Sequence, residues 1–176
     1  MEIHLIRHTT PAVEKGIVYG QRLDVGLAKT FHREADKIST LISKHSYDAV
    51  ICSPALRCIQ LADYIFKGNY KIDPRIAEMD FGAWEGRKWN DIPQDELDAW
   101  MKSYKVLSPP GGENLNQMEQ RINDFLSGLP FQPASRIALI THAGVIRLIL
   151  SRYNKIPLNK IFDKKIEFGE VRVVNI

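Results

Sequence analysis

Residues 136–153 read RIALITHAGVIRLILSRY, and this stretch decides the fold class to expect. It begins with a run of apolar residues, from Ile137 to Ile140, which is typical of a parallel strand buried on both faces. Apolar side chains with helical spacing follow almost at once, from Val145 to Tyr153. A buried strand that leads directly into a helix predicts an α/β fold with a mostly parallel sheet.

The rest of the chain repeats this alternation of short apolar runs and helical patterns. We therefore expect a three-layer α/β/α sandwich, with a mostly parallel sheet and helices on both of its faces. Ser53 and Pro54 indicate a helix start, as N-cap and first helical residue. The predicted strands cover residues 3–6, 49–52, 71–76, 136–141 and 171–176, and the predicted helices cover residues 27–45, 54–66, 91–104, 115–129 and 145–153.

A single domain over residues 1–176 is expected, because no linker, internal repeat or low-complexity tract divides the chain. The region of about 82–112 breaks the alternation, and we expect it to be a small cap insertion over the sheet edge. Its aromatic side chains could form the cap's own core or stack on a flat substrate ring, and both interpretations stay open. The aromatic residues in or beside this region are Trp84, Trp89, Trp100 and Tyr104.

The composition argues against several classes of partner. The formal net charge of +3 is too small to indicate a nucleic acid or a membrane surface as partner. No segment approaches the roughly 20 apolar residues of a membrane span. The two cysteines, Cys52 and Cys58, are expected to be free thiols in a reducing compartment, so we expect a cytoplasmic protein. No closely spaced set of Cys and His predicts a metal site.

The residues that follow the predicted strands are the candidates for chemistry, because ligands of open α/β sheets bind at the carboxyl ends of the strands. We expect these side chains to converge on one site: Arg7, His8, Arg57, Glu78 and His142. The remaining histidines are expected to have structural or surface positions, with His4 buried and hydrogen-bonded in the first strand and His32 and His45 at the surface.

This set of side chains suits phosphoryl transfer. Two guanidinium groups offer forked donors that match phosphate oxygens, and the helix start near Ala143 offers backbone N–H groups to an anion. A neutral imidazole is a competent nucleophile toward phosphorus, and nearby positive charge keeps it neutral. A glutamic acid can protonate the leaving oxygen as the ester bond breaks. The expected partner is a small phosphorylated metabolite, and the oligomeric state stays open.

The chain also resembles a known family. Residues 5–11, LIRHTTP, are similar to the signature of the histidine phosphatase superfamily, the phosphoglycerate-mutase-like proteins. Within it, the α-ribazole phosphatase group is the most similar, because it includes members with Arg-His-Thr and a Tyr-Gly-Gln segment before an Asp. The other matching segments follow in the family's order: residues 19–24, 53–57, 78–86, 110–113 and 141–144.

The resemblance implies a role for each site residue and a reaction without a metal or other cofactor. His8 resembles the phosphorylated nucleophile, and Glu78 resembles the acid that protonates the leaving oxygen and then activates water. The implied phosphate contacts are Arg7, Gln21, Arg57, His142 and the backbone N–H of Ala143. The implied substrate is α-ribazole 5′-phosphate, an intermediate in the assembly of the lower ligand of cobalamin.

Five residues depart from the family signatures; two of them, Gly26 and Ala28, replace a Pro and a Thr before the first long helix and do not touch the chemistry. Thr9 replaces a glycine, so the loop beside His8 is not expected to use a conformation that only glycine adopts. Thr10 replaces an acidic or amide residue. Glu14 stands where many relatives have an asparagine that contacts phosphate, and a carboxylate there is expected to point away from the site.

Other functions share the same phosphate pocket. A phosphoglycerate mutase must keep water out, and its relatives resemble longer chains with more capping structure and a C-terminal tail, so the sequence favours a phosphatase. A sugar-bisphosphate phosphatase is a second alternative. A non-catalytic phosphoester-binding regulator is a third, although such proteins typically lose the nucleophile or the acid, and His8 and Glu78 are both present.

Overall fold

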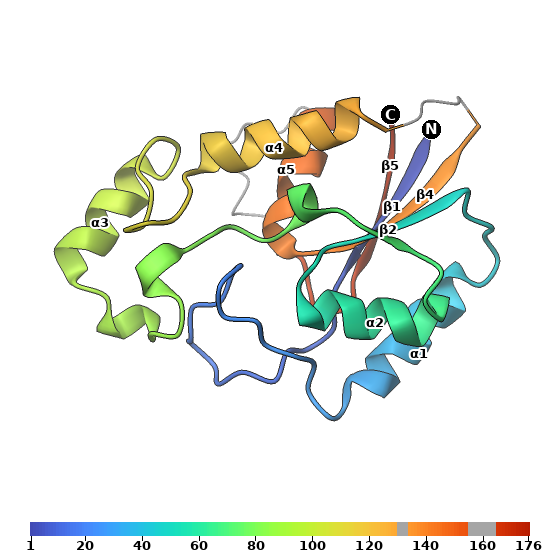
Figure 1. The fold of residues 1–176 in the computed structure, drawn as a ribbon, viewed down its shortest axis with the longest axis horizontal. Coiled ribbons are helices and arrows are strands. Elements are labelled where there is room, and N and C mark those ends of the chain that lie inside the picture. Colours follow the sequence, from blue (N-terminus) through green and yellow to red (C-terminus); the bar gives the residue numbers. More distant parts are fainter. Residues whose placement is uncertain (130–133, 155–164) are drawn as a thin grey trace.

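One sheet organises the computed structural model, with its strands in the order β3-β2-β4-β1-β5 (Figure 1). The structure describes residues 1–129, 134–154 and 165–176. Within these ranges β5 runs antiparallel to β1, and the other neighbouring strands are parallel. The strands are β1 Glu2–Arg7, β2 Ala49–Cys52, β3 Lys71–Ile72, β4 Arg136–Thr141 and β5 Val171–Asn175.

Separate pairs of helices cover the two faces of the sheet (Figure 1). Since alternate strand residues point to opposite faces, Ile137 and Leu139 pack with α4 and α5, whereas Ala138 and Ile140 pack with α1 and α2. The predicted three-layer sandwich is therefore confirmed. These helices are α1 Phe31–Ile42, α2 Leu56–Phe66, α4 Leu115–Ser127 and α5 Ala143–Tyr153.

Several predicted element boundaries are wrong: the helix expected over residues 27–45 covers only Phe31–Ile42, and two others have an identifiable cause. Helix α2 begins at Leu56 behind an extended Ala55, and Ser53 does not cap it, because the Ser53 hydroxyl lies against His142 instead. The predicted strand at residues 71–76 ends at Ile72, because Pro74 starts a short 3₁₀ turn and has no N–H for a sheet ladder.

The region of about 82–112 contains short 3₁₀ turns at Gly82–Trp84 and Trp89–Asp91 and the helix α3, Gln94–Ser103. Helix α3 stands apart from the sheet (Figure 1). Trp84 and Trp100 nevertheless belong to the same buried cluster as the strand residues on the α4 and α5 side. The interpretation of this region as a cap within one domain stays a prediction.

The carboxyl ends of β1, β2 and β4 meet at one edge of the sheet, as their parallel register requires. Strand β1 ends at Arg7, and the backbone N–H of His8 then donates to the Thr141 carbonyl at 3.0 Å. The residues after these strands are therefore brought side by side. Among the described helices, none has the length and apolar character needed to cross a bilayer.

Candidate active site

Two histidines and an arginine are buried together at the carboxyl edge of the sheet. His8 follows β1 and His142 follows β4, and their ring centroids lie 5.2 Å apart. Arg57, in the first turn of α2, is completely buried and places Nη2 at 3.2 Å from Nδ1 of His142. The convergence expected from the strand ends is therefore present for these side chains.

The hydrogen bond that His8 makes sets its tautomer. Its Nδ1 lies 2.8 Å from the Thr9 carbonyl oxygen, which can only accept, so Nδ1 carries the hydrogen. The lone pair of His8 is therefore on Nε2. Burial, together with the nearby Arg57 and Arg7 guanidinium groups, holds the pKa of His8 well below that of an ordinary imidazole. A neutral imidazole with an available Nε2 lone pair has the form that a nucleophile requires.

His142 is held in the complementary tautomer. The Arg57 guanidinium can only donate, so Nδ1 of His142 accepts, and Nε2 carries the hydrogen toward Ser53 Oγ at 2.7 Å. Burial, followed by the charge of Arg57, also places the pKa of His142 well below its ordinary value. Ser53 thus positions a ring of the site, a role that its place before a helix did not indicate.

The cations of the site have donors that the protein does not satisfy. Nε and Nη1 of Arg57 and Nε of Arg7 are buried without a hydrogen-bond partner in the described part of the chain. Arg57 Nη2 donates to the Gly20 carbonyl at 2.8 Å, and Arg7 Nη1 donates to the Ile166 carbonyl. A buried donor without a partner costs about 1–3 kcal/mol, so both guanidinium groups favour an anionic ligand.

The Glu78 carboxylate lies against the start of α5 and lines the same cavity as Arg7 and His8. It accepts from the backbone N–H groups of Met79 at 3.0 Å and Gly144 at 3.2 Å. A Cβ on Gly144 would lie 2.2 Å from Glu78 Oε1, so only glycine leaves room for this carboxylate. Arg121 donates to the carbonyl oxygens of Ala77 and Glu78, which fixes the backbone that carries the acid.

Glu85 organises the turn beside the site. Its carboxylate accepts backbone hydrogen bonds at 2.7–3.1 Å from Gly20, Gln21, Arg22, Leu23 and Phe81. Glycine is required at position 20, because a Cβ there would lie 2.0 Å from the Met79 carbonyl oxygen. A single carboxylate thus holds the turn that carries Tyr19 and Gln21 against the Glu78 segment.

A cavity of about 340 Å³ opens beside His8. Its polar wall consists of Arg7, His8, Tyr19, Glu78 and Arg147, and its apolar wall includes Phe81, Trp89, Trp100, Leu115 and Met118. The aromatic residues of the 82–112 region therefore divide between the two roles considered from the sequence. Trp84 is core, with its Nε1 donating to Glu96, and Trp89 lines the cavity; Trp100 belongs to the buried cluster and also lines the cavity.

Ala143, Gln21 and Glu14, which the sequence analysis also considered, differ in how close they lie to the cavity. Ala143 lines the cavity at the start of α5. Gln21 does not line it; its amide donates to the Glu78 carbonyl at 2.8 Å and to Glu113 at 3.2 Å, so phosphate contact by Gln21 remains an untested prediction. Glu14 is exposed and pairs with Lys88 at 2.7 Å, pointing away from the site as expected.

Three residues of the site were missed by the sequence analysis. Arg147 lies on α5 on the same helix face as Ala143 and Gly144, a spacing that could have identified it. Tyr19 precedes the Gly-Gln pair of the family signature but was given no role. Phe168 packs on both the Arg7 guanidinium, 3.9 Å from the ring centroid, and the His8 ring, and this long-range contact has no sequence signal.

The comparisons with known proteins agree with this geometry. The family model of the histidine phosphatase superfamily (branch 1) matches residues 3–176, so the chain belongs to this superfamily. It is similar to the adenosylcobalamin/alpha-ribazole phosphatase of Escherichia coli (strain K12), at 27% identity over 96% of this chain and 87% of the relative. The corresponding protein of Salmonella typhimurium is 29% identical over 91% of this chain and 75% of the relative.

A solved structure shares the fold over the whole length of this chain. The alpha-ribazole phosphatase of Shigella flexneri matches with a TM-score of 0.89 at 26% identity, covering 100% of this chain and 91% of that chain. Family membership and phosphatase relatives together identify the chain as a phosphatase.

Proposed function

We propose that this chain is a metal-independent phosphomonoesterase that forms a phosphohistidine on Nε2 of His8. In the first step the Nε2 lone pair attacks phosphorus, and the bond between phosphorus and the ester oxygen breaks. The electron pair of that bond goes to the leaving oxygen, which takes a proton from the Glu78 carboxyl group. Arg7, Arg57 and His142 bind the transferred phosphoryl group.

In the second step water replaces the alcohol. The Glu78 carboxylate takes a proton from the attacking water, whose oxygen forms a bond to phosphorus. The bond between phosphorus and Nε2 breaks, and its electron pair returns to His8. Inorganic phosphate leaves, and Glu78 is again protonated for the next turnover. Each residue thus acts in both steps, with Glu78 alternating between acid and base.

The observation that carries the proposal is the buried Arg57, whose Nε and Nη1 donors have no partner in the described chain while its Nη2 lies beside His142. A completely buried cation is stable only when its charge is compensated, and a phosphoryl group beside His8 supplies that charge. Glu78 lines the same cavity as His8 and Arg7, a position that suits protonation of a leaving oxygen.

The substrate we propose is α-ribazole 5′-phosphate, with the product used for the lower ligand of cobalamin. The names of the relatives favour it. The apolar wall also favours a leaving group with a flat ring, because Phe81, Trp89 and Trp100 line the cavity and can stack on it. A sugar bisphosphate or a phosphoglycerate has no comparable apolar surface to bury there.

The test is phosphate release in EDTA from α-ribazole 5′-phosphate, p-nitrophenyl phosphate, 3-phosphoglycerate and fructose-2,6-bisphosphate. We expect the highest kcat/KM on α-ribazole 5′-phosphate. A stronger preference for fructose-2,6-bisphosphate would identify a sugar-bisphosphate phosphatase instead, and isomerised phosphoglycerate without phosphate release would identify a mutase. Stable binding without turnover of any ester would contradict the enzymatic proposal and favour a phosphoester-binding regulator.

A further inference from the structure

Tyr19 lies between the two arginines of the site. Its side chain lines the cavity together with Arg7, His8 and Glu78. The guanidinium carbon of Arg57 lies 5.2 Å from the centroid of the Tyr19 ring. The phenol therefore lines the same cavity as the candidate nucleophile and lies beside Arg57, one of the cations expected to bind the phosphoryl group.

The Tyr19 phenol lies within electrostatic reach of the guanidinium groups of both Arg7 and Arg57. A guanidinium group can only donate, so a contact with Arg7 or Arg57 would use the phenol oxygen as acceptor and would leave the phenol hydrogen for another acceptor. Burial raises the pKa of Tyr19, although Arg7 and Arg57 act against this change, so the phenol keeps its hydrogen at neutral pH. In this position Tyr19 offers a neutral donor beside two cations.

The backbone around Tyr19 is fixed on both sides. The N–H of Val18 donates to the Arg87 carbonyl at 2.8 Å, and the N–H of Gly20 donates to the Glu85 carboxylate at 2.9 Å. Arg57 holds the Gly20 carbonyl at 2.8 Å. A donor held by its own backbone needs little reorganisation when charge develops on the substrate, which is the property of an effective catalytic group.

We propose that Tyr19 is a further catalytic residue, whose hydroxyl donates a hydrogen bond to a phosphoryl oxygen of the bound ester. This inference rests on the proposed function of the same site. In the phosphoryl transfer described above, Tyr19 would stay protonated throughout and stabilise the negative charge of the oxygens around phosphorus. It would not protonate the leaving oxygen, which remains the task of Glu78.

The test is the Tyr19→Phe variant, which keeps the ring against Arg57 and removes only the hydroxyl. We expect kcat/KM to fall about 10- to 100-fold, as for the loss of one hydrogen bond to a charged group. Because the lost contact is to the phosphoryl group, the loss should be equal for an alkyl ester and for p-nitrophenyl phosphate. Tyr70→Phe, which removes a phenol paired with Asp63, is the matched control and should leave kcat/KM unchanged.

Orthovanadate binding separates this inference from the proposed function. We expect Tyr19→Phe to weaken vanadate binding about tenfold at unchanged Tm, a result that can be obtained even if no tested ester is hydrolysed. A wild-type protein that binds vanadate but releases no phosphate would contradict the proposed function alone. Vanadate affinity and kcat/KM both within twofold of wild type in Tyr19→Phe would overturn the role of Tyr19, as would a loss confined to alkyl esters.

Discussion

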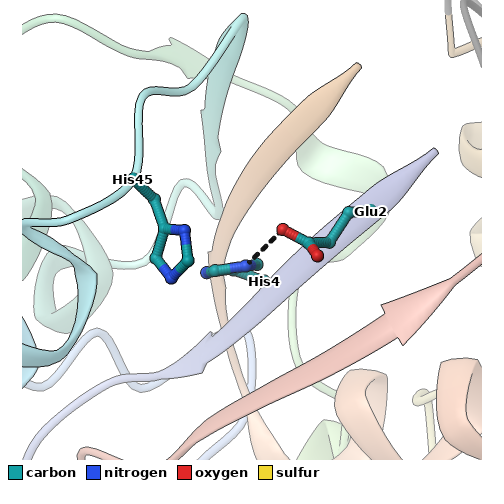
Figure 2. Close-up of side chains that lie close together, drawn as sticks. All are labelled: Glu2, His4 and His45. Atoms are coloured by element: carbon teal, nitrogen blue, oxygen red, sulfur yellow. Dashed lines mark hydrogen bonds and ion pairs between the residues drawn. The ribbon is translucent and has the colours of Figure 1, made fainter. Parts of the chain in front are cut away.

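His4 lies within strand β1 and His8 directly follows it, so the two histidines lie toward opposite edges of the sheet. The two edges differ in how their charges are compensated. At the carboxyl edge His8 pairs with His142, with ring centroids 5.2 Å apart. Near the amino edge His4 pairs with His45, with ring centroids 4.7 Å apart (Figure 2). Both pairs lie near an arginine, so the residue types alone do not distinguish them.

The amino edge is a closed ion-pair network. Glu2 accepts from Nε2 of His4 at 3.0 Å, as Figure 2 shows, and also from Arg136. The Tyr47 hydroxyl lies 2.7 Å from the other ring nitrogen of His4. The donor atoms of Glu2, His4 and His45 lie within 4.8 Å of one another, a set that metals can use, but Arg136 already compensates the carboxylate.

At the carboxyl edge the arginine charges are not compensated by carboxylates. Among the described residues, neither Arg7 nor Arg57 forms an ion pair with a carboxylate, and both have buried donors without partners. The same residue types therefore have opposite consequences. A cation that is paired inside the protein holds the fold together, whereas a buried cation that is left unpaired creates an anion site.

The largest expected effect separates the two histidine pairs by activity. His8→Ala should lower kcat by about 10⁴-fold or more, because it removes the nucleophile. His45→Ala, the matched change at the amino edge, should leave kcat within about twofold, because surface substitutions are mostly small in effect. Phosphate release from p-nitrophenyl phosphate measures both. Turnover by His8→Ala near the wild-type rate would refute the phosphohistidine mechanism.

The two carboxylates should differ next. Glu78→Gln should slow hydrolysis of an alkyl phosphate by about 10²- to 10⁴-fold, the usual contribution of a general acid, and slow that of an aryl phosphate much less, because an aryl oxide leaves without protonation. Glu2→Gln should affect neither substrate. Steady-state rates on an alkyl and an aryl ester provide the measurement. Equal losses on both esters in Glu78→Gln would show that Glu78 is not the acid.

The two arginines should respond differently to inorganic phosphate. Phosphate at 100 times its Kd should stabilise the wild-type protein by about 2.7 kcal/mol, because it binds the open edge of the folded state. Arg57→Met should lose this stabilisation, whereas Arg136→Met should keep it while lowering the basal Tm. Thermal melts with and without phosphate test both variants. An undiminished phosphate response in Arg57→Met would contradict the assignment of the anion site.

The last comparison concerns the pH dependence of stability. The folded-state pKa values of His8 and His142 lie well below the unfolded value of about 6.5, so the unfolded chain takes up protons first as pH falls. Stability should therefore be intact above pH 6.5 and fall below it by about 1.4 kcal/mol per pH unit for each group. Urea unfolding in phosphate-free buffer measures this slope.

His8→Asn and His45→Ala sharpen the pH experiment. His8→Asn should remove about half of the slope contributed by the buried pair. Burial, followed by the charge of His4, also lowers the pKa of His45, but its solvent access makes the contribution small, so His45→Ala should keep most of the slope. If His45→Ala removed more of the slope than His8→Asn, the electrostatic comparison between the two edges would be wrong.

The helices and strands could be predicted from local sequence patterns, because a buried strand or helix face requires apolar residues at regular spacing. The bounds of β2 and β4 agree with the prediction to the residue, since both are short apolar runs between clear breaks. The start of α2 was wrong, because Ser53 has the properties of a cap but its hydroxyl is engaged by His142, 89 positions away. No local pattern reveals that competition.

The sequence by itself determined the layers, the ends of β2 and β4, and the residues that meet at the carboxyl edge. This was possible because parallel strands carry whatever follows them to one edge, and His8, Arg57, Glu78 and His142 follow strands. Only the tertiary structure decided which charges are paired. Arg57 beside Tyr19, Phe168 on His8, and Arg136 on Glu2 all depend on packing between distant segments. Such packing determines whether a cation is paired within the protein or is left to bind an anion.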